Sequence, residues 1–440
     1  MNITDSAIDS CSGYGKPLTP ENECLAVTLA LVLFFPAVEF RRHAMKTFLA
    51  LVATLALAGC GDTSSEAAPL ELAPDGTGDT GGGDTGDTGG TGGTGDTGQP
   101  AVVSDRFSVR GTIEQIYVWA ADPGAAIEVE APDGEIIAGN ADDLGSLVMR
   151  GIEPGDGYIV RLADEPDERT EDVSVLSKEG SLPDEAFYSG QDLQPGYGYI
   201  TMRDGTQLSI FVSLPGPPED GPYPTIVNYS GYSPSKPGES LGAEVEVFCG
   251  SFPILCDAPG HPSGLLAGIA GYASVGVNMR GTGCSGGAYD FFEPLQLTDG
   301  YDIIEIVARQ GWVKHNKVGM AGLSYPGISQ LFVAQTQPPS LAAITPMSVL
   351  ADSASSTLAP GGIYNTGFAL SWIDNVLDRA EPYGHAWITK LVEEGDALCE
   401  DNQLLHSAKV DVVAKALANP YYTDEVARPV DPSAWVDKIN

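Results

Sequence analysis

Hydrophobic and polar residues alternate in a series of short runs between residues 101 and 177, and turn residues such as Asp133-Gly134 separate the runs. The runs lie at 107–110, 116–119, 126–130, 146–149 and 158–162. Alternation of this kind predicts strands with one buried face, and several short strands at such spacing are typical of a small antiparallel β-sandwich. We therefore predict an accessory β-sandwich over residues 101–178, with the role of a spacer or a surface-binding module left open.

From residue 190 onward, continuous apolar runs alternate with segments of helical periodicity. The first run, 199–212, predicts a hairpin that turns at Asp204-Gly205. Buried strands are predicted at 224–229, 273–278, 317–323 and 341–346. Strands that alternate with helices indicate a mostly parallel sheet with helices on its faces. We predict an α/β core over 190–350 and a helical segment over 351–434.

The N-terminal part contains two apolar stretches, 25–38 and 48–58, and both are shorter than the roughly 20 residues of a membrane span. Basic residues precede the second stretch, which ends in Leu57-Ala58-Gly59-Cys60. This resembles a bacterial lipoprotein signal peptide over 45–60, and the resemblance implies that Cys60 carries the lipid anchor. An ordinary secretory signal with a chance cysteine is the alternative. Residues 1–44 are then an upstream extension.

Residues 61–100 consist largely of Gly, Thr and Asp, and they contain eight acidic residues and no Lys or Arg. Such a segment lacks apolar area to bury, so it predicts a flexible tether. Over 40 residues its root-mean-square reach is about 35 Å. The tether would hold an exported protein clear of the membrane surface to which its lipid is anchored.

Beyond residue 100, 47 acidic residues face only 18 Lys and Arg, an excess of 29 negative charges. The folded surface is therefore acidic, which disfavours nucleic acid as a partner. The sequence leaves the oligomeric state open.

A candidate nucleophile follows the predicted strand at 317–323. The residues are Gly322-Leu323-Ser324-Tyr325-Pro326-Gly327, and an apolar helical pattern comes directly after them. A serine between a strand and a helix, flanked by glycines, is typical of a nucleophile elbow. The generic elbow is G-x-S-x-G, and this chain has its second glycine one position later. The motif alone therefore leaves a Gly-Ser turn without chemistry equally open.

Three further segments join the serine motif in a recognisable order. They are Asn278-Met279-Arg280-Gly281-Thr282-Gly283-Cys284-Ser285-Gly286-Gly287, then Asp299-Gly300-Tyr301-Asp302, then Gln310-Gly311-Trp312. Together with the serine motif they resemble the CocE/NonD hydrolases, which include cocaine-esterase-like acyl esterases and X-prolyl dipeptidyl peptidases. The serine motif of that family is G-x-S-Y-x-G. The resemblance covers about 197–440 and implies an α/β-hydrolase fold with a helical cap over 351–434.

The resemblance also assigns roles to individual residues. It implies that Ser324 is the nucleophile and that the backbone N–H of Tyr325 is one oxyanion donor. It implies that the hydroxyl of Tyr232 is the second donor. A phenol O–H fits this role, because ring packing can fix it in place.

The remaining members of a serine triad are expected elsewhere. The family order places an acid and then a histidine after the serine, and only His385 and His406 follow Ser324. Both lie in the predicted cap, so we expect packed or surface roles for them. We expect residues 435–440 to begin the next core strand and the acid and histidine to lie beyond residue 440.

Four cysteines remain in the predicted folded part, Cys249, Cys256, Cys284 and Cys399, and they permit three disulfide pairings between which the sequence does not choose. Their spacing does not match a zinc site, so we predict neither a metal nor a cofactor.

The predicted function is that of an exported, membrane-anchored serine hydrolase, on the periplasmic or cell-surface side. It would cleave a small ester or an X-Pro peptide through an acyl-enzyme on Ser324. The alternative is a non-catalytic, surface-anchored binding module on the same fold.

Overall fold

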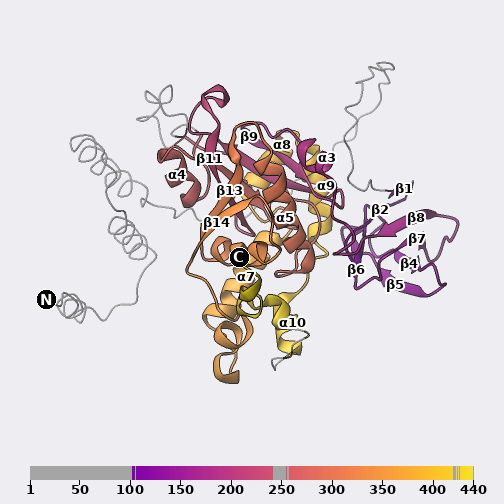
Figure 1. Ribbon diagram of the computed structural model, residues 1–440. Coiled ribbons are helices and arrows are strands. Elements are labelled where there is room, and N and C mark those ends of the chain that lie inside the picture. Colours follow the sequence, from indigo (N-terminus) through magenta and orange to yellow (C-terminus); the bar gives the residue numbers. More distant parts are fainter. Residues whose placement is uncertain are drawn as a thin grey trace, which may run out of the picture. The chain divides into compact units, whose positions relative to one another are not determined.

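The computed structural model describes residues 102–104, 106–240, 254, 257–419, 423, 425 and 427–439 (Figure 1). The predicted upstream extension, signal peptide and tether lie outside the described residues, as do Cys60, Cys249 and Cys256.

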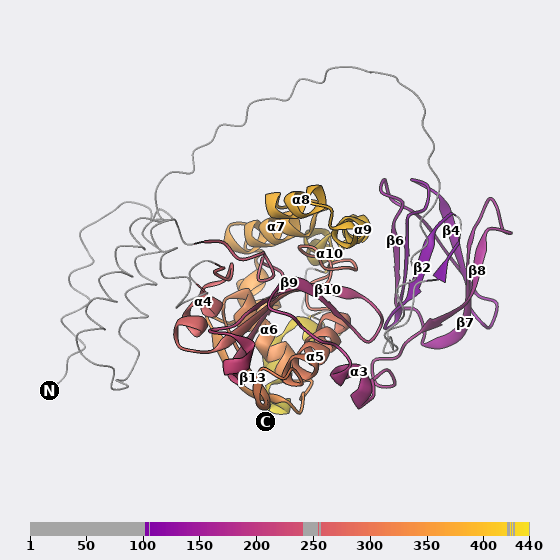
Figure 2. The same cartoon turned by 90° about the horizontal axis from the view of Figure 1, so that it is seen from above.

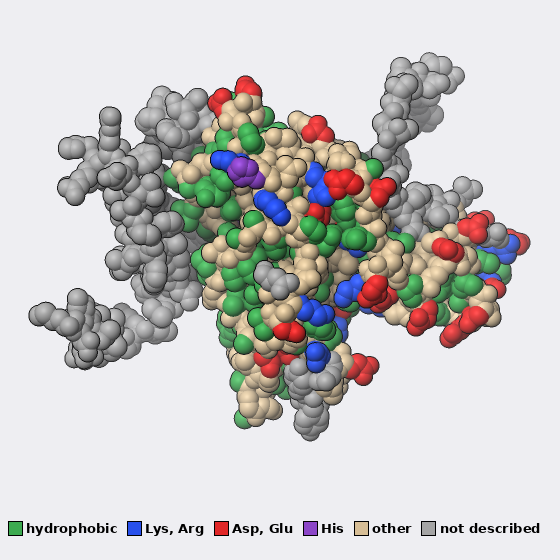
Figure 3. Space-filling model, viewed as in Figure 1, with side chains coloured by type: hydrophobic (Ala, Val, Ile, Leu, Met, Phe, Trp, Pro, Cys, Tyr) green, Lys and Arg blue, Asp and Glu red, His purple; other side chains and the backbone are tan. Residues whose placement is uncertain are grey.

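Two four-stranded antiparallel sheets form the N-terminal part, in the strand orders β1-β2-β3-β6 and β5-β4-β7-β8. The strands are β1 (Val102–Val103), β2 (Ser108–Gly111), β3 (Gln115–Trp119), β4 (Ala126–Glu130), β5 (Ile136–Asn140), β6 (Leu147–Arg150), β7 (Gly155–Leu162) and β8 (Arg169–Val175). Alternate residues bury a shared core that includes Val109, Ile127 and Val160. Acidic side chains are spread over the outside of this sandwich (Figure 3).

A six-stranded mixed sheet forms the second part, in the order β14-β13-β11-β12-β10-β9. Its strands are β9 (Gly196–Thr201), β10 (Gln207–Ser213), β11 (Tyr223–Ser230), β12 (Ala273–Asn278), β13 (Val313–Leu323) and β14 (Leu341–Met347). The predicted hairpin is the antiparallel pair β9 and β10, and β12, β11, β13 and β14 run parallel. The predicted α/β-hydrolase fold, preceded in the chain by a small β-sandwich, is confirmed.

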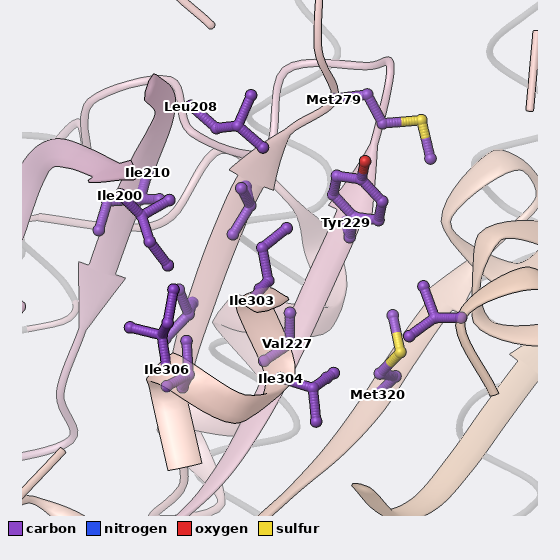
Figure 4. Close-up of a cluster of buried hydrophobic side chains, with 14 of the residues drawn as sticks. Ile200, Leu208, Ile210, Val227, Tyr229, Met279, Ile303, Ile304, Ile306 and Met320 are labelled. Carbon is purple, nitrogen blue, oxygen red and sulfur yellow. The ribbon is translucent and has the colours of Figure 1, made fainter. Parts of the chain in front are cut away.

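Three helices pack on this sheet: α4 (Pro262–Ile269), α5 (Pro294–Ala308) and α6 (Tyr325–Ala334). A short helix, α3 (Glu185–Ser189), packs on α5. Figure 4 shows Ile303, Ile304 and Ile306 of α5 among side chains of the strands, such as Val227 and Ile210. Burial of this cluster holds α5 on the sheet, and the segments after β11 and β13 carry the residues of the candidate site.

The cap consists of α7 (Phe368–Ala380), α8 (Ala386–Glu393), α9 (Ala397–His406) and α10 (Val412–Ala418); α7 packs on α10 and α8 packs on α9, and all four lie on the same side of the core in Figure 2. A π-turn (Ala354–Leu358) and a 3₁₀ turn (Pro360–Gly362) precede them. A disulfide between Cys284 and Cys399 links α9 to the loop after β12. This selects one of the three pairings that the sequence left open.

The sandwich packs against the hydrolase core and the cap. Tyr117 and Trp119 of β3 form one apolar cluster with Leu295 of α5 and Leu405 of α9. Beside this cluster, Gln115 Nε2 donates a hydrogen bond to Glu293 Oε2 at 2.7 Å. Burial raises the pKa of Glu293 to about 7. The sandwich is thus joined to the core by an apolar contact and a buried polar one.

The expected start of a strand at 435–440 is wrong for the described residues, which end at 439. Val436–Lys438 form a 3₁₀ turn instead. The turn brings Lys438 Nζ to 4.6 Å from the centre of the Trp435 ring, and the Arg428 guanidinium lies 5.1 Å from the same ring. Contacts on the indole therefore favour a compact turn over an extended chain.

Within the described ranges, none of the helices is both long and apolar enough to cross a membrane. The same part of the chain contains no group of three or more His, Cys, Asp or Glu side chains arranged to hold a metal ion.

Candidate active site

Ser324 lies at a sharp turn between β13 and α6. Its backbone has φ 66° and ψ −124°, a conformation that non-glycine residues rarely adopt and that costs about 1–3 kcal/mol. Hydrogen bonds hold the turn. Ser324 N donates to the carbonyl of Met347 at 2.9 Å, and the Ser324 carbonyl accepts from the N–H groups of Gly327 and Ile328 at 2.7 and 2.8 Å. The serine is half-buried.

The serine motif requires glycine at two positions, because neighbouring atoms lie too close to leave room for a Cβ atom. A Cβ atom on Gly322 would lie 2.6 Å from Pro326 Cβ, and one on Gly327 would lie 2.5 Å from the Met347 carbonyl oxygen. Pro326 lies in the first turn of α6, where a missing N–H has no helical partner to lose. The spacing G-x-S-Y-x-G thus builds a strand-turn-helix elbow, although it departs from the generic pattern.

Tyr232 lies on the loop after β11, and its hydroxyl is 3.5 Å from Ser324 Oγ. Asn278 at the end of β12 holds this loop, because its Nδ2 donates to the Tyr232 carbonyl at 2.7 Å. The Asn278 Oδ1 accepts from both the N–H and the hydroxyl of Ser235. The neighbouring Gly231 is also constrained, since a Cβ there would lie 2.6 Å from the Tyr325 ring.

The side chain of Tyr325 is fully buried, and its hydroxyl is 2.9 Å from that of Tyr289. The buried ring anchors the first turn of α6. No acceptor among the described residues takes a hydrogen bond from the Tyr325 N–H. Such a free N–H directly after a nucleophile is suited to stabilising an oxyanion. The structure therefore brings together the three residues that the sequence singled out.

The cap contributes a residue that sequence reasoning missed. Trp372 of α7 donates from Nε1 to the Tyr232 hydroxyl oxygen at 3.0 Å. An indole N–H can only donate, so the phenol oxygen is the acceptor in this bond. The phenol hydrogen is therefore free to point at Ser324 Oγ or at an oxyanion formed beside it. The apolar periodicity of 368–380 gave no sign of this contact.

Replacing Trp372 with phenylalanine is expected to lower kcat by about tenfold, because the phenol loses the bond that orients it. KM should change little, since the bond is not made to substrate. Trp387 on α8 supplies a matched control: its indole nitrogen is buried without a partner among the described residues, so Trp387→Phe should leave kcat close to wild type. Equal losses of kcat in the two variants would contradict the orienting role.

The two histidines after Ser324 occupy other positions. His406 is fully buried and its Nε2 is 2.8 Å from the Ser285 carbonyl, and burial lowers its pKa to about 4. His385 precedes α8 and is half-buried; burial lowers its pKa, and Arg379 and Lys236 lower it further. Among the residues that the structure describes, no histidine forms a hydrogen bond with Ser324.

Arg280 lies in the first of the segments that resemble the CocE/NonD hydrolases, and it forms a buried charge cluster with Asp204 and Asp299. Its guanidinium bonds Asp299 through Nε and Nη2 and bonds Asp204 through Nη1, at 2.6–3.0 Å. Thr206 and the sandwich residue Tyr117 accept weaker bonds from Nη1, at 3.0 and 3.4 Å. Burial acts to lower the pKa of Arg280, but the two carboxylates outweigh it and hold the pKa above its usual value.

Comparison with known proteins matches residues 204–439 to the family described as X-Pro dipeptidyl-peptidase (S15 family). A candidate serine esterase of Mycobacterium bovis is 30% identical over 210 residues, which are 44% of this chain and 33% of that protein. A candidate serine esterase of Mycobacterium tuberculosis matches equally. This chain thus spans about a third of the length of the curated relatives it matches.

Solved structures give distant matches. A CocE/NonD family hydrolase from Staphylococcus aureus is 24% identical, with a TM-score of 0.40, over 55% of this chain and 38% of that one. An α-amino acid ester hydrolase is 20% identical, with a TM-score of 0.39, over 54% of this chain and 39% of that one.

Proposed function

Because this chain belongs to the X-Pro dipeptidyl-peptidase (S15) family, we propose that it is a serine hydrolase that forms an acyl-enzyme on Ser324. The substrate is a carboxylic ester or an X-Pro peptide bond. The observation that carries the proposal is the approach of the Tyr232 hydroxyl to within 3.5 Å of Ser324 Oγ at a strained strand-to-helix turn.

The geometry supports the following sequence of events. Ser324 Oγ attacks the carbonyl carbon, and the carbonyl oxygen becomes an oxyanion. The oxyanion accepts hydrogen bonds from the Tyr232 O–H and the Tyr325 N–H. Two such donors, fixed before the substrate arrives, stabilise the developing charge without reorganisation. Collapse of the tetrahedral intermediate expels the alcohol or amine, and water then hydrolyses the acyl-enzyme. A general base takes the Ser324 proton during the attack and gives it to the leaving alcohol or amine; we take this base to be a histidine held by an acid, as in other serine hydrolases of this fold.

We favour an ester as the substrate. The mycobacterial relatives are named as serine esterases, which agrees with this choice. An X-Pro dipeptidyl peptidase must also bind the free α-amino group of its substrate, for which a nearby carboxylate is suited.

A panel of p-nitrophenyl esters against X-Pro p-nitroanilides, with the full-length protein, tests the choice. Ester hydrolysis should exceed anilide hydrolysis in kcat/KM, and faster cleavage of X-Pro anilides would assign the peptidase activity instead. Absence of both activities, with no labelling of Ser324 by a fluorophosphonate, would favour the non-catalytic binding module.

The same proposal places the enzyme outside the cytoplasm, anchored through a lipid on Cys60. The support is the signal-like sequence before Cys60 and the Gly/Thr/Asp-rich tether after it. Metabolic labelling with a radioactive fatty acid should mark the protein, and Cys60→Ser should remove the label. A label that persists in Cys60→Ser would contradict this assignment.

A further inference from the structure

Arg379 lies against the ring of the oxyanion phenol, and His385 interacts electrostatically with Arg379 and Lys236, on a chain that is otherwise strongly acidic. We refer to Lys236, Arg379 and His385 as the cationic patch. Its central member is Arg379, whose guanidinium carbon lies 5.0 Å from the centre of the Tyr232 ring. Arg379 is seven residues after Trp372, so both lie on the face of α7 that meets the phenol.

The Arg379 guanidinium has N–H donors that no described carboxylate binds. It is half-buried, and within the described part of the chain it forms no ion pair or hydrogen bond with a carboxylate. By contrast, the buried arginines Arg203 and Arg280 each bond a carboxylate. A guanidinium that stacks on a ring keeps its N–H edge available for a planar, two-oxygen acceptor.

The other two members of the patch add little to the charge of Arg379. Lys236 lies four residues after Tyr232, and its ammonium pairs with Glu239 at 2.7 Å. His385 has a buried Nε2 without a partner among the described residues. Burial lowers the pKa of His385, and the charges of Arg379 and Lys236 lower it further. No acidic side chain raises that pKa.

The surroundings of Arg379 suit a negatively charged substrate better than a positively charged one. In the described part of the chain, no acidic side chain bonds Ser324, Tyr232, Trp372 or Arg379. A substrate with a free amino group would meet Arg379 without a compensating carboxylate, whereas a carboxylate would find an unpaired guanidinium.

We propose that Arg379 binds a carboxylate of the substrate, so that the preferred substrates are esters whose acyl part carries a negative charge. The carboxylate would lie between the cap and the oxyanion phenol, and the ester carbonyl would reach Ser324. This inference rests on the proposed function and specifies its substrate class. A hydrogen bond between two charged groups is among the stronger ones in proteins, so the preference should be at least about tenfold.

Three methyl esters of similar length test the inference in the full-length protein: monomethyl adipate, methyl hexanoate and methyl 6-aminohexanoate. Hydrolysis is followed by alkali uptake at constant pH. Monomethyl adipate should have the highest kcat/KM, at least about tenfold above methyl hexanoate, and the amino ester should have the lowest. In Arg379→Gln the adipate-to-hexanoate ratio should fall towards one, and Arg379→Lys should retain an intermediate ratio.

Lys390→Gln is the matched control, because Lys390 is an exposed cation on the neighbouring helix α8. It should keep the wild-type ratio, and thermal unfolding should verify that each variant is folded. A wild-type ratio near one, a preference for the amino ester, or a ratio that survives Arg379→Gln would each overturn the inference while leaving the hydrolase assignment intact. Failure to hydrolyse all three esters and to react with a fluorophosphonate would overturn the proposed function itself.

Discussion

Replacing Ser324 with alanine is expected to lower kcat/KM for ester hydrolysis on the order of 10⁵-fold, because no acyl-enzyme can form without the hydroxyl. The oxyanion donors remain in this variant, so a small residual rate above the uncatalysed reaction should persist. Steady-state kinetics with a p-nitrophenyl ester measures both quantities. Ser371→Ala, at an exposed position of α7, should leave the rate unchanged and serves as the control.

A second substitution at position 324 tests whether the serine is kept for activity at the expense of stability. Ser324 has φ 66°, a conformation that suits glycine better than serine. Ser324→Gly should therefore abolish activity and yet raise the thermal unfolding midpoint. A lower midpoint together with retained activity would contradict the assignment of Ser324 as a strained nucleophile.

Replacing Arg280 with methionine is expected to destabilise the protein by roughly 3–5 kcal/mol, because Asp204 and Asp299 are left buried without their shared cation. Chemical denaturation measures the loss as a change in the free energy of unfolding. Arg106→Met is the matched control, since Arg106 forms its ion pairs at the surface, and the midpoint should then shift little.

The contribution of Asp204 to the pH dependence of stability should differ in sign between wild type and this variant. Burial acts to raise the pKa of Asp204, but Arg280 outweighs burial and holds the pKa below its usual value. In wild type this contribution is therefore present at neutral pH and is lost as the pH falls through the depressed pKa. In Arg280→Met the folded-state pKa should exceed the usual value, so the variant should gain stability as the pH falls from neutral. A parallel pH profile for the two proteins would contradict the cluster's role.

Local signals were sufficient to predict the elbow and the sheet. Backbone conformation follows from the local sequence at the glycines around Ser324, at the turn of Asp204-Gly205 and in the short apolar runs. The strands therefore lie close to where the sequence predicted them. Tyr232 was found through the resemblance, since nothing in its immediate sequence distinguishes an oxyanion donor from a packing aromatic.

The sequence did not predict contacts between distant segments. Trp372 reaches Tyr232 across 140 positions of sequence, and Arg280 joins residues from the hairpin and α5. The sequence indicated a spacer or a surface-binding module for the sandwich, yet its Gln115 and Tyr117 contact the buried charges of the core. The periodicity of a helix shows which face is apolar, but it does not show which side chain meets a phenol on another element.

The most direct test of the account is the reaction of the full-length protein with a fluorophosphonate, followed by mass spectrometry of its peptides. The account predicts one phosphonyl group, on Ser324, and a rate of labelling about 10²-fold lower in Tyr232→Phe because one oxyanion donor is lost. Labelling at a different serine, or an unchanged rate in Tyr232→Phe, would contradict the claim that Ser324 and the phenol of Tyr232 form the catalytic centre.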